Sequence, residues 1–459
     1  MPRGSLGDES MSVARKIVPL QNPLDAVVHV PGSKSFTNRA LVCAALAPGT
    51  SQIRGALVAD DTAAMSSALG ALGAEIVAGP AAPPLLGGNI DLTVDGVELP
   101  RRVASASGAA EPISVNARQS GTTSRFLLAV AALCEVDVYV DGHPQLRARP
   151  MADGIEALQQ LGCRVESANG GLPVLIRPPI GEFSSEISVN GAVSSQFLSG
   201  LLLAAPCLRN GLRISVSGKL QSLPYVEMTI GVMRQFGAIV TANTGFTDIA
   251  VAPTGYTPTD YVVEPDASAA SYFWAAGALC GGRVFVPGLT TESLQGDVRF
   301  VDTLEAMGAE VKRSTEGIAV GGSGVLRGVA ADFSEISDTA QTLAALAPFA
   351  SSSTEISGIG FIRAKEIDRL QAIVSELRRC GVPAFELADG VRIDPAQPHP
   401  AVIQPLEDHR MAMAFSLLGL RSEGIQIADP GCVAKTFPHY WEVFEDMCTQ
   451  HSAARGTAT

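Results

Sequence analysis

Charged and hydroxyl side chains gather where apolar helices are expected to begin. Lys34, Ser35 and Arg39 open the apolar run in PGSKSFTNRALVCAALA, and Gly121 and Arg125 open the run in SGTTSRFLLAVAAL. The N–H groups and dipole of a helix N-terminus attract anions, and they disfavour a nearby cation unless an anion is present. The pattern therefore predicts binding of negatively charged groups, although each segment taken alone is also compatible with an ordinary capped helix.

Other segments repeat this arrangement with different side chains. Lys365 and Arg369 are four residues apart, so either neighbouring acids such as Glu366 or a bound anion must offset their repulsion. The further candidates are Arg149, Ser194, Ser195, Gln196, Ser222, Tyr225, His409, Arg410 and Lys435. Hydroxyl and amide groups can donate hydrogen bonds to phosphate oxygens. Because the side chains differ from segment to segment, they favour an enzyme cleft for an irregular, multiply anionic small molecule over a symmetric clamp.

The composition indicates a large folded protein with an excess of acidic groups. Of 459 residues, 46% are apolar and 17% are charged, and 33 basic against 46 acidic residues give a net charge of −13. A chain of this length is expected to form about two or three domains. General nucleic-acid binding needs a basic surface, so no nucleic-acid partner is expected, whereas a locally positive cleft can still hold a small anion.

The cysteines and the apolar runs predict a cytoplasmic protein. Eight cysteines occur singly without a C-x-x-C pair, which favours reduced thiols over a disulfide framework or a zinc site. The N-terminal MPRGSLGDESMSVARK lacks the apolar stretch of a secretory signal. The longest apolar runs, 126–134 and 197–207, are shorter than the roughly 18 residues that a membrane span needs, so no membrane partner is expected.

Two glycine patterns recur along the chain at intervals of about 70–90 residues. Glycines expected to end helices are Gly73, Gly162, Gly237, Gly308 and Gly381. Glycines that follow β-rich runs are Gly55, Gly142, Gly218, Gly288, Gly358 and Gly431. The shared period predicts six copies of one α/β unit, whereas glycines that merely follow helices would not keep this spacing. The first interval is the longest because of residues 79–112, in which the segments AGPAAPPLLGGNI (78–90) and ASASGAAEP (104–112) are rich in Pro, Gly and Ala and are expected to form extra surface loops.

Nine motifs, in order between about residue 20 and residue 447, closely resemble the enolpyruvyl transferases. They are PGSKSFTNRA, SGTTSRF, RARPM, VSSQFLSGLL, SLPYVEMT, ISDTAQT, RAKEIDRL, DHRMAMAFSL and AKTFPHYW. The resemblance implies an α/β fold, a two-lobed inside-out α/β barrel of six βαβαββ-type units, three per lobe. One lobe would combine residues 13–32 with 265–447, and the other would span 33–264. Residues 1–12 and 448–459 are expected to be flexible ends.

The resemblance also implies a reaction, which would move the enolpyruvyl group of phosphoenolpyruvate to the 5-hydroxyl of shikimate 3-phosphate and release phosphate. Asp338 would act as the base for the hydroxyl, Glu366 would exchange a proton with the methylene carbon, and Lys34 and His409 would complete the catalytic set. Shikimate 3-phosphate would contact Lys34, Ser35, Arg39, Ser194, Ser195, Gln196, Ser222, Tyr225, Asp338 and Lys365. Phosphoenolpyruvate would contact Lys34, Gly121, Arg149, Gln196, Arg369, Arg410 and Lys435. Two polyanions held side by side need several fixed cations, as this set provides.

The same reaction involves no redox step, so neither a metal nor an organic cofactor is expected. The protein is also expected to be a monomer. Three positions depart from the family pattern. Phe361 stands where relatives often carry Asn, and Gln119 and Ser120 replace an Asn-Ala pair, which affects substrate choice and inhibitor response. Gly121 leaves room at the phosphoenolpyruvate site, which predicts sensitivity to glyphosate.

Three alternatives differ in what they require of the sequence. An enolpyruvyl transferase for UDP-N-acetylglucosamine would need a Lys-Asn pair where this chain has Lys34-Ser35, and a reactive loop cysteine. A non-catalytic repeat scaffold is disfavoured by the unlike charged clusters. A paralogous transferase acting on a shikimate-like substrate stays open, because Phe361 lies in the region that would contact the ring substituents.

Overall fold

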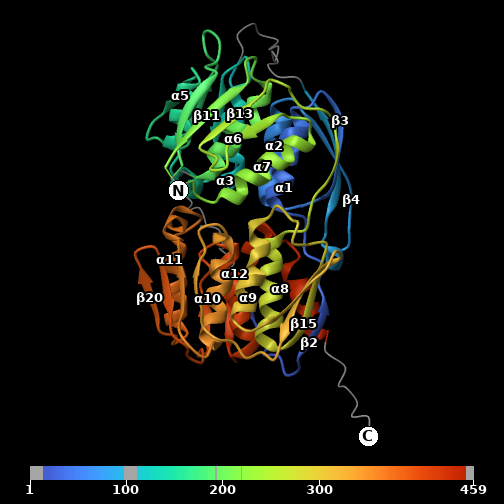
Figure 1. The fold of residues 1–459 in the computed structure, drawn as a ribbon, viewed down its shortest axis with the longest axis vertical. Helices are drawn as coiled ribbons and strands as arrows, with labels where there is room; N and C mark the ends of the chain where they lie inside the picture. Colours follow the sequence, from blue (N-terminus) through green and yellow to red (C-terminus); the bar gives the residue numbers. More distant parts are fainter. Residues whose placement is uncertain (1–13, 98–110, 192–193, 219, 451–459) are drawn as a thin grey trace, which may run out of the picture.

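The computed structural model describes residues 14–97, 111–191, 194–218 and 220–450, arranged as two lobes stacked end to end (Figure 1). Each lobe has its own hydrophobic core. The core of the upper lobe in Figure 1 is built from residues between Phe36 and Val263. The core of the lower lobe combines residues 17–30 with residues 267–447. We propose that the domain boundaries lie between these cores, near residues 32 and 265.

The described strands form six sheets. The first sheet of the upper lobe contains β3 (Gly49–Ala56), β4 (Glu75–Ala81), β5 (Ile90–Gly96) and β14 (Asp260–Val262). The second contains β6 (Ile113–Asn116), β7 (Val138–Asp141), β8 (Arg164–Ser167) and β9 (Val174–Arg177). The third contains β10 (Glu186–Asn190), β11 (Leu212–Ser217), β12 (Val240–Ala242) and β13 (Asp248–Val251). The first sheet of the lower lobe contains β2 (Leu24–Val27), β15 (Gly282–Pro287), β16 (Glu310–Arg313) and β17 (Gly317–Gly322). The second contains β18 (Ala330–Asp332), β19 (Thr354–Ser357), β20 (Ala384–Leu387) and β21 (Gly390–Ile393). The third contains β1 (Arg15–Lys16), β22 (Ala401–Ile403) and β23 (Ile425–Ile427).

The five four-stranded sheets share one arrangement. In each, a parallel pair of strands is extended by two antiparallel strands, as in the order β6-β7-β9-β8. The sixth sheet also begins with a parallel pair, β22 and β23, but β1 from the N-terminal end supplies its antiparallel strand. The mixed pairing explains why short alternating runs such as VDVYVDG and LRISVSG read as strands that bury one face.

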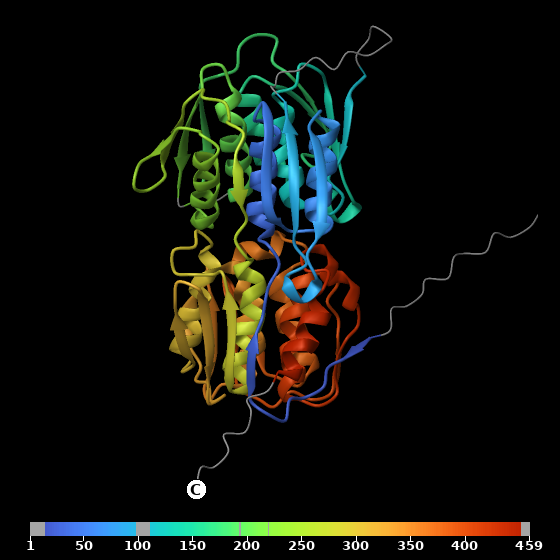
Figure 2. The same cartoon turned by 90° about the vertical axis from the view of Figure 1, so that its right-hand side faces the viewer.

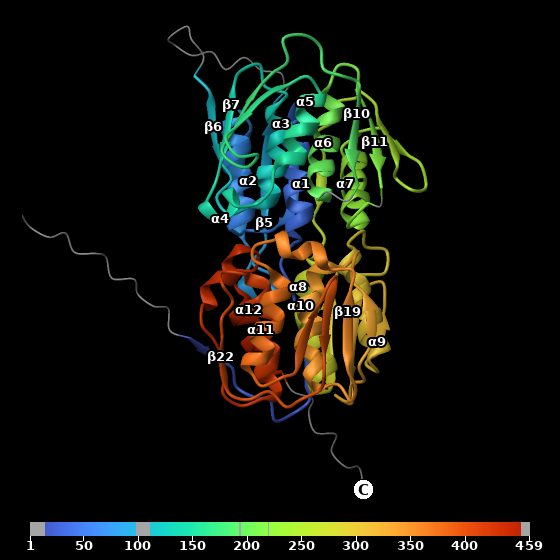
Figure 3. The same cartoon turned by 90° about the vertical axis from the view of Figure 1, so that its left-hand side faces the viewer.

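Helices fill the inside of each lobe and the sheets lie around them (Figures 1 and 3). The most buried helices are α1 (Lys34–Ala45), α3 (Gly121–Ala131), α6 (Ser195–Ala204), α8 (Ala267–Cys280), α10 (Ala340–Leu346) and α12 (His409–Arg421). Partly exposed helices are α2 (Asp60–Ala71), α5 (Ala152–Gln160), α7 (Leu223–Gln235), α9 (Phe300–Ala306), α11 (Arg369–Arg379) and α13 (Tyr440–Thr449). Apart from a few polar and charged side chains, such as Arg39 of α1 and Arg410 of α12, the first group consists of apolar or small residues, which is the composition of a helix with little solvent-facing surface.

The glycines predicted to end helices do so. Gly73, Gly162, Gly237, Gly308 and Gly381 directly follow the ends of α2, α5, α7, α9 and α11, and their φ angles lie between 77° and 111°. This left-handed conformation is accessible to glycine without strain.

The chain crosses between the lobes twice, and the two crossings lie side by side. The N–H of Ser33 donates to the carbonyl of Glu264 at 2.8 Å, and the N–H of Asp266 donates to the carbonyl of Pro31 at 2.8 Å. On either side of the crossing, β2 pairs with β15 in the lower lobe and β14 pairs with β3 in the upper lobe. The hinge therefore consists of two hydrogen-bonded segments.

The expectation of a loop over residues 78–90 is wrong at both ends of that segment, because strand β4 continues to Ala81 and strand β5 begins at Ile90. Residues 90–96 form β5, which pairs with both β3 and β4 because its alternating Ile, Leu and Val side chains face the core. The tip of the β4–β5 hairpin carries a short helix, Pro84–Leu86, which contacts α13 of the lower lobe (Figure 2). Of the second expected loop, over residues 104–112, residues 104–110 lie outside the described residues.

The two predicted flexible ends lie almost wholly outside the described residues. This holds for residues 1–12 and for residues 451–459 of the predicted tail, whereas residues 448 and 449 belong to α13. All eight cysteines are free thiols. Within the described ranges, no helix combines the length and the apolar character needed to cross a membrane.

Candidate functional site

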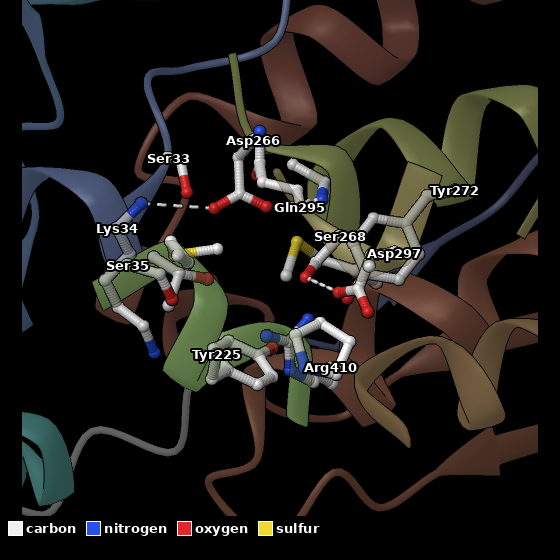
Figure 4. Close-up of a pocket in the computed structure, with 16 residues that line it drawn as sticks. Ser33, Lys34, Ser35, Tyr225, Asp266, Ser268, Tyr272, Gln295, Asp297 and Arg410 are labelled. Atoms are coloured by element: carbon white, nitrogen blue, oxygen red, sulfur yellow. Dashed lines mark hydrogen bonds between the residues drawn. The ribbon is translucent and has the colours of Figure 1, made fainter. Parts of the chain in front are cut away.

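A pocket lies at the junction of the two lobes, and both lobes contribute to its walls (Figure 4). Lys34 and Ser35 reach it from the start of α1, and Tyr225 reaches it from the first turn of α7. The lower lobe contributes Arg410 from the first turn of α12. The other polar side chains that line it are Ser33, Asp266, Ser268, Tyr272, Gln295, Asp297 and Thr436. Four of the predicted site residues, Lys34, Ser35, Tyr225 and Arg410, therefore share one pocket.

Lys34 is held at both its backbone and its side chain. Its N–H donates to Oδ2 of Asp266 at 3.1 Å, and Oδ1 of Asp266 caps α8 by accepting from the N–H of Ala269 at 2.9 Å. The ammonium group lies 3.2 Å from Oδ2 of Asp61, a buried residue of α2. These contacts fix a cation of the upper lobe against the start of a lower-lobe helix.

Glu366 is surrounded by cations from three different segments. Its carboxylate oxygens lie 2.8 Å from Nη2 of Arg369, 3.4 Å from Nζ of Lys435 and 3.4 Å from Nη2 of Arg149. Burial by itself raises the pKa of Glu366, but the three cations outweigh burial and hold the pKa well below its usual range. Arg149 belongs to the upper lobe, so this cluster joins the lobes.

Asp338 joins the lobes in the same way. It accepts from Nη2 of Arg410 at 2.8 Å and from the hydroxyl of Tyr225 at 2.9 Å, and it lies 3.3 Å from Nη1 of Arg369. Burial by itself raises the pKa of Asp338, but Arg410, followed by Lys365 and Arg369, lowers the pKa far below the ordinary value. The lowered pKa values favour the ionised form of both Asp338 and Glu366.

Asp408 holds the start of α12 and the guanidinium of Arg369 together. Oδ1 accepts from the N–H of Arg410 at 2.9 Å, and Oδ2 accepts from Nε of Arg369 at 2.7 Å. The side chains of Asp408 and Arg369 are both almost completely inaccessible to solvent. The arrangement orients Arg369 toward Asp338 and Glu366, because its fork-shaped guanidinium can face several carboxylates in one plane.

Gly121 lies directly under two guanidinium groups. A Cβ at this position would stand 2.7 Å from Nη1 of Arg149 and 3.0 Å from Nη1 of Arg125. Arg125 donates to Oε1 of Gln196 at 2.6 Å, and the amide of Gln196 donates to Thr122 at 3.1 Å. Burial, together with Arg149, lowers the pKa of Arg125 to about 10. Two buried cations thus converge at the start of α3, and among the described residues only Arg149 forms an ion pair, with Glu366, which favours a further anion beside Arg125.

His409 is buried in the first turn of α12, and both of its ring nitrogens lack a hydrogen-bond partner among the described residues. Burial and the neighbouring Arg410 lower the pKa of His409 well below its usual range. The imidazole is therefore neutral and offers one donor and one acceptor for a ligand.

Arg39 does not face the pocket. Its guanidinium donates to Thr229 at 2.7 Å, to the carbonyl of Ser35 at 2.9 Å and to the carbonyl of Tyr225 at 3.1 Å, and only 2% of the residue is exposed. In this conformation Arg39 fastens α1 to α7, so its predicted contact with a substrate carboxylate would require these bonds to rearrange.

The predicted phosphate-binding residues lie at the starts of α6 and α7 and on the loop before α11. Ser194 caps α6, Ser195 begins it, and Ser222 precedes α7 in a left-handed conformation. The ammonium of Lys365 stands 5.8 Å from the ring centroid of Phe361, and burial lowers the pKa of Lys365. The carbonyl of Ser222 accepts from the N–H of Tyr225 at 3.1 Å, but within the described residues no hydrogen bond joins the side chains of the three serines to Asp338 or Glu366.

Several acidic residues of the site were missed by the sequence predictions: Asp61, Asp266 and Asp297. The pocket residues Ser268, Tyr272 and Gln295 were also missed. One usable pattern was Asp266-Ala-Ser268 ahead of the apolar run 267–280, which has the form of a helix cap. Nothing in the local sequence reveals that this cap faces Lys34 from the other lobe.

The geometry suits reactions of anionic substrates. Six cations, Lys34, Arg125, Arg149, Arg369, Arg410 and Lys435, lie around two ionised carboxylates at one interface. The cations can stabilise developing negative charge, and the carboxylates can accept protons.

Known proteins that are similar to this chain include enolpyruvyl transferases. The family described as EPSP synthase (3-phosphoshikimate 1-carboxyvinyltransferase) matches residues 18–444. A curated 3-phosphoshikimate 1-carboxyvinyltransferase of Nostoc punctiforme is 41% identical over 438 residues, covering 95% of this chain and 99% of that protein. A solved EPSP synthase of Acinetobacter baumannii has a TM-score of 0.77 at 25% identity, covering 95% of this chain and 98% of the other. The enolpyruvyl transferase NikO of Streptomyces tendae shares the fold at 17% identity, with a TM-score of 0.72 over 95% and 97% of the chains. The predicted α/β transferase fold is confirmed.

Proposed function

The chain belongs to the EPSP synthase family, and we propose on this premise that the lobe junction is its active site. The reaction transfers the enolpyruvyl group of phosphoenolpyruvate to the 5-hydroxyl of shikimate 3-phosphate and releases phosphate. The observation that carries the proposal is the meeting of upper-lobe Arg149 and lower-lobe Glu366, Arg369 and Lys435 in one cluster. Only a ligand held between the lobes can use cations from both.

Phosphoenolpyruvate is assigned to the cations around Gly121 and Glu366. Arg125 and Arg149 lie above Gly121, where the absence of a Cβ lets both guanidinium groups approach the start of α3 and present their charge to a phosphate or carboxylate. Arg369, Arg410 and Lys435 complete its surroundings from the lower lobe, and Lys34 and Gln196 from the upper lobe. These cations offset the charge repulsion between the two substrates.

Shikimate 3-phosphate is assigned to the upper lobe. Its 3-phosphate would lie near Ser194, Ser195, Ser222 and Lys365, with Gln196 and Tyr225 beside it, and its carboxylate near Ser35 and Arg39. Asp338 would then face the 5-hydroxyl, because its carboxylate already accepts from the hydroxyl of Tyr225.

The chemistry proceeds by addition and elimination. Asp338 takes the proton of the 5-hydroxyl while the hydroxyl oxygen forms a bond to C2 of phosphoenolpyruvate. Glu366 gives a proton to C3, which becomes a methyl group. The resulting tetrahedral intermediate returns one proton from C3 to Glu366 and expels phosphate, which takes up the proton held by Asp338. The double bond is thereby restored, and both carboxylates return to their starting states. Lys34 stabilises the charge that develops on the phosphate, and neutral His409 supplies a hydrogen bond.

Substrate binding itself prepares the two carboxylates for this work. Glu366 carries a proton only if its pKa rises, and Arg369, Lys435 and Arg149 now hold the pKa well below its usual range despite burial. When substrate anions bind the same cations, these cations stabilise the ionised carboxylates less strongly. The proton affinities of Glu366 and Asp338 then rise only in the loaded site.

A phosphate-release assay with both substrates tests the proposal. We expect release that requires shikimate 3-phosphate and phosphoenolpyruvate together. Lys34→Ala, Asp338→Asn and Glu366→Gln should each lower turnover by about two or more decades, as expected for positioned acid–base and charged groups. Asp302→Asn removes an exposed acid of α9 and should leave turnover unchanged. Absence of phosphate release from the folded wild-type protein would refute the assignment, and wild-type rates in a variant would remove that residue.

We also propose that the protein works in a reducing compartment such as the cytoplasm. All eight cysteines are unpaired, and four of them, Cys43, Cys134, Cys163 and Cys380, are buried in the two cores. Buried thiols contribute to packing and need no oxidising environment.

A further inference from the structure

Asp297 is a buried carboxylate for which the reaction outlined above has no use. It lies in the short helix Gly296–Arg299, is 5% exposed and lines the pocket at the lobe junction. The hydroxyl of Ser268 donates to its Oδ2 (Figure 4). Among the described residues, no Lys, Arg or His forms an ion pair with it. A carboxylate buried without a cation is costly when ionised, so its presence in the pocket needs a reason.

The helix of Asp297 packs against α8, against α9 with its exposed acids Asp302 and Glu305, and against the short helix Ser337–Thr339, which carries Asp338. The titratable groups that line the pocket with Asp297 are Asp266 at the cap of α8, Tyr272 of α8, Tyr225 of α7 and Lys34 of α1. Arg410 of α12 lines the same pocket and donates to Asp338 at 2.8 Å. Burial and the charge of Asp338 raise the pKa of Asp297 to about 7, while the Ser268 hydrogen bond and Arg410 act in the opposite direction.

We propose that Asp297 is a positioning residue, whose charge controls how tightly Arg410 holds the base Asp338. The inference rests on the proposed function. While Asp297 is neutral, Asp338 is the only carboxylate in the described residues that pairs with the guanidinium of Arg410, and the strength of this pair makes Asp338 a weak base. When Asp297 ionises, it attracts Arg410 and repels Asp338. Both effects raise the proton affinity of Asp338, which strengthens it as the acceptor for the substrate hydroxyl.

The consequence is a dependence of turnover on pH near neutrality. Turnover should rise as Asp297 loses its proton. Asp297→Asn keeps the size of the side chain but cannot ionise, so it should remove this rising limb and leave a rate that changes less with pH. Ser268→Ala removes a hydrogen bond that favours the charged form, so it should move the limb to higher pH. A purely structural role would lower the rate by one factor at all pH values.

The experiment measures turnover at saturating substrates from about pH 5.5 to 9 in wild type, D297N and S268A. Asp302→Asn, an exposed acid of the neighbouring helix α9, is the control and should keep the wild-type profile. Titration of the substrate phosphates is common to all four proteins, so differences between profiles report on the protein. Loss of the limb in D297N, or its upward shift in S268A, supports the proposal.

An unchanged limb in D297N would overturn the proposal while leaving the proposed function intact. If D297N fails to fold, S268A decides, because an unshifted limb there overturns it equally. A wild-type protein that releases no phosphate would overturn both the proposed function and this inference.

Discussion

At the scale of single residues, the site is organised by cations that act on carboxylates. Two unit charges about 4 Å apart interact by about 4 kcal/mol at an effective dielectric constant of about 20. Three cations around Glu366 can therefore outweigh the cost of burying its charge, and the pKa of Glu366 moves down even though burial alone would raise it. Asp297 has no such partner in the described residues, and burial raises its pKa.

Gly121→Ala should weaken phosphoenolpyruvate binding without unfolding the protein. The added Cβ would stand 2.7 Å from Nη1 of Arg149, so the guanidinium must move away from the position assigned to the ligand. A charge-assisted hydrogen bond is worth about 1.5–3 kcal/mol, so its loss corresponds to a KM for phosphoenolpyruvate about tenfold or more higher. Inhibition by glyphosate, which the site should permit, should weaken together with phosphoenolpyruvate binding.

Gly70→Ala is the matched control, because a Cβ at this position of α2 meets nothing within 4 Å. Gly70→Ala should leave the KM for phosphoenolpyruvate and the inhibition by glyphosate unchanged, and it should slightly stabilise the helix. An unchanged KM in Gly121→Ala, measured by steady-state kinetics, would argue against a ligand beneath Arg149.

At the scale of secondary-structure elements, the start of α12 is the most constrained part of the site. Asp408 caps the helix and also pairs with buried Arg369. Asp408→Ala should lower the free energy of unfolding by about 3–5 kcal/mol, because it leaves a buried charge without its partner. Asp408→Asn keeps a capping oxygen and should cost less.

Urea unfolding of the two variants measures this difference. Asp302→Ala serves as the comparison, since it removes one acid from the partly exposed pairs of Arg313 and should cost less than about 1 kcal/mol. Equal losses in Asp408→Ala and Asp302→Ala would show that burial adds nothing to the Asp408–Arg369 pair.

The elements differ in how well the sequence predicts them. Helix starts that carry cations, such as Lys34 and Arg410, stand out because a cation there is unfavourable without an anion. Acidic caps do not stand out, because Asp266 satisfies the ordinary rule for starting a helix, and only the fold shows that it also contacts Lys34. Strand β5 was missed because the Pro- and Gly-rich stretch before it hid its short alternating pattern.

Arg39 shows a further limit of sequence reasoning. Its motif predicts contact with a substrate carboxylate, yet its guanidinium is satisfied by Thr229 and two backbone carbonyls. Local sequence gives the position of such a side chain on the helix. The direction of its guanidinium is decided by acceptors on α7, which lies far away along the chain.

At the scale of the whole molecule, ion pairs across the lobe junction should make stability depend on pH. A carboxylate with a lowered pKa in the folded state stabilises the protein above its unfolded value of about 4, and this contribution is lost as pH falls toward the lowered value. Glu366 and Asp338 both belong to this class. The protein should therefore lose stability steeply below about pH 4.

Glu366→Gln tests this expectation. At pH 7 it should be less stable than wild type, because three cations then face no carboxylate at this position. The difference in Tm should shrink below about pH 4, as Glu366 of the wild type takes up its own proton. Glu310→Gln, which changes an exposed acid of β16, should show a Tm close to wild type throughout. A gap that stays constant down to pH 3 would mean that Glu366 titrates normally.

The double crossing of the chain has a consequence for how the protein is made. Strand β2 leaves the ribosome early, but its partner β15 begins 258 residues later, at Gly282 against Leu24. The upper lobe is encoded entirely between them and can assemble while the lower lobe still lacks most of its chain. During synthesis Leu24 and Ala26 of the N-terminal segment therefore stay exposed to solvent until the second half of the polypeptide has emerged and can bury them in the core of the lower lobe.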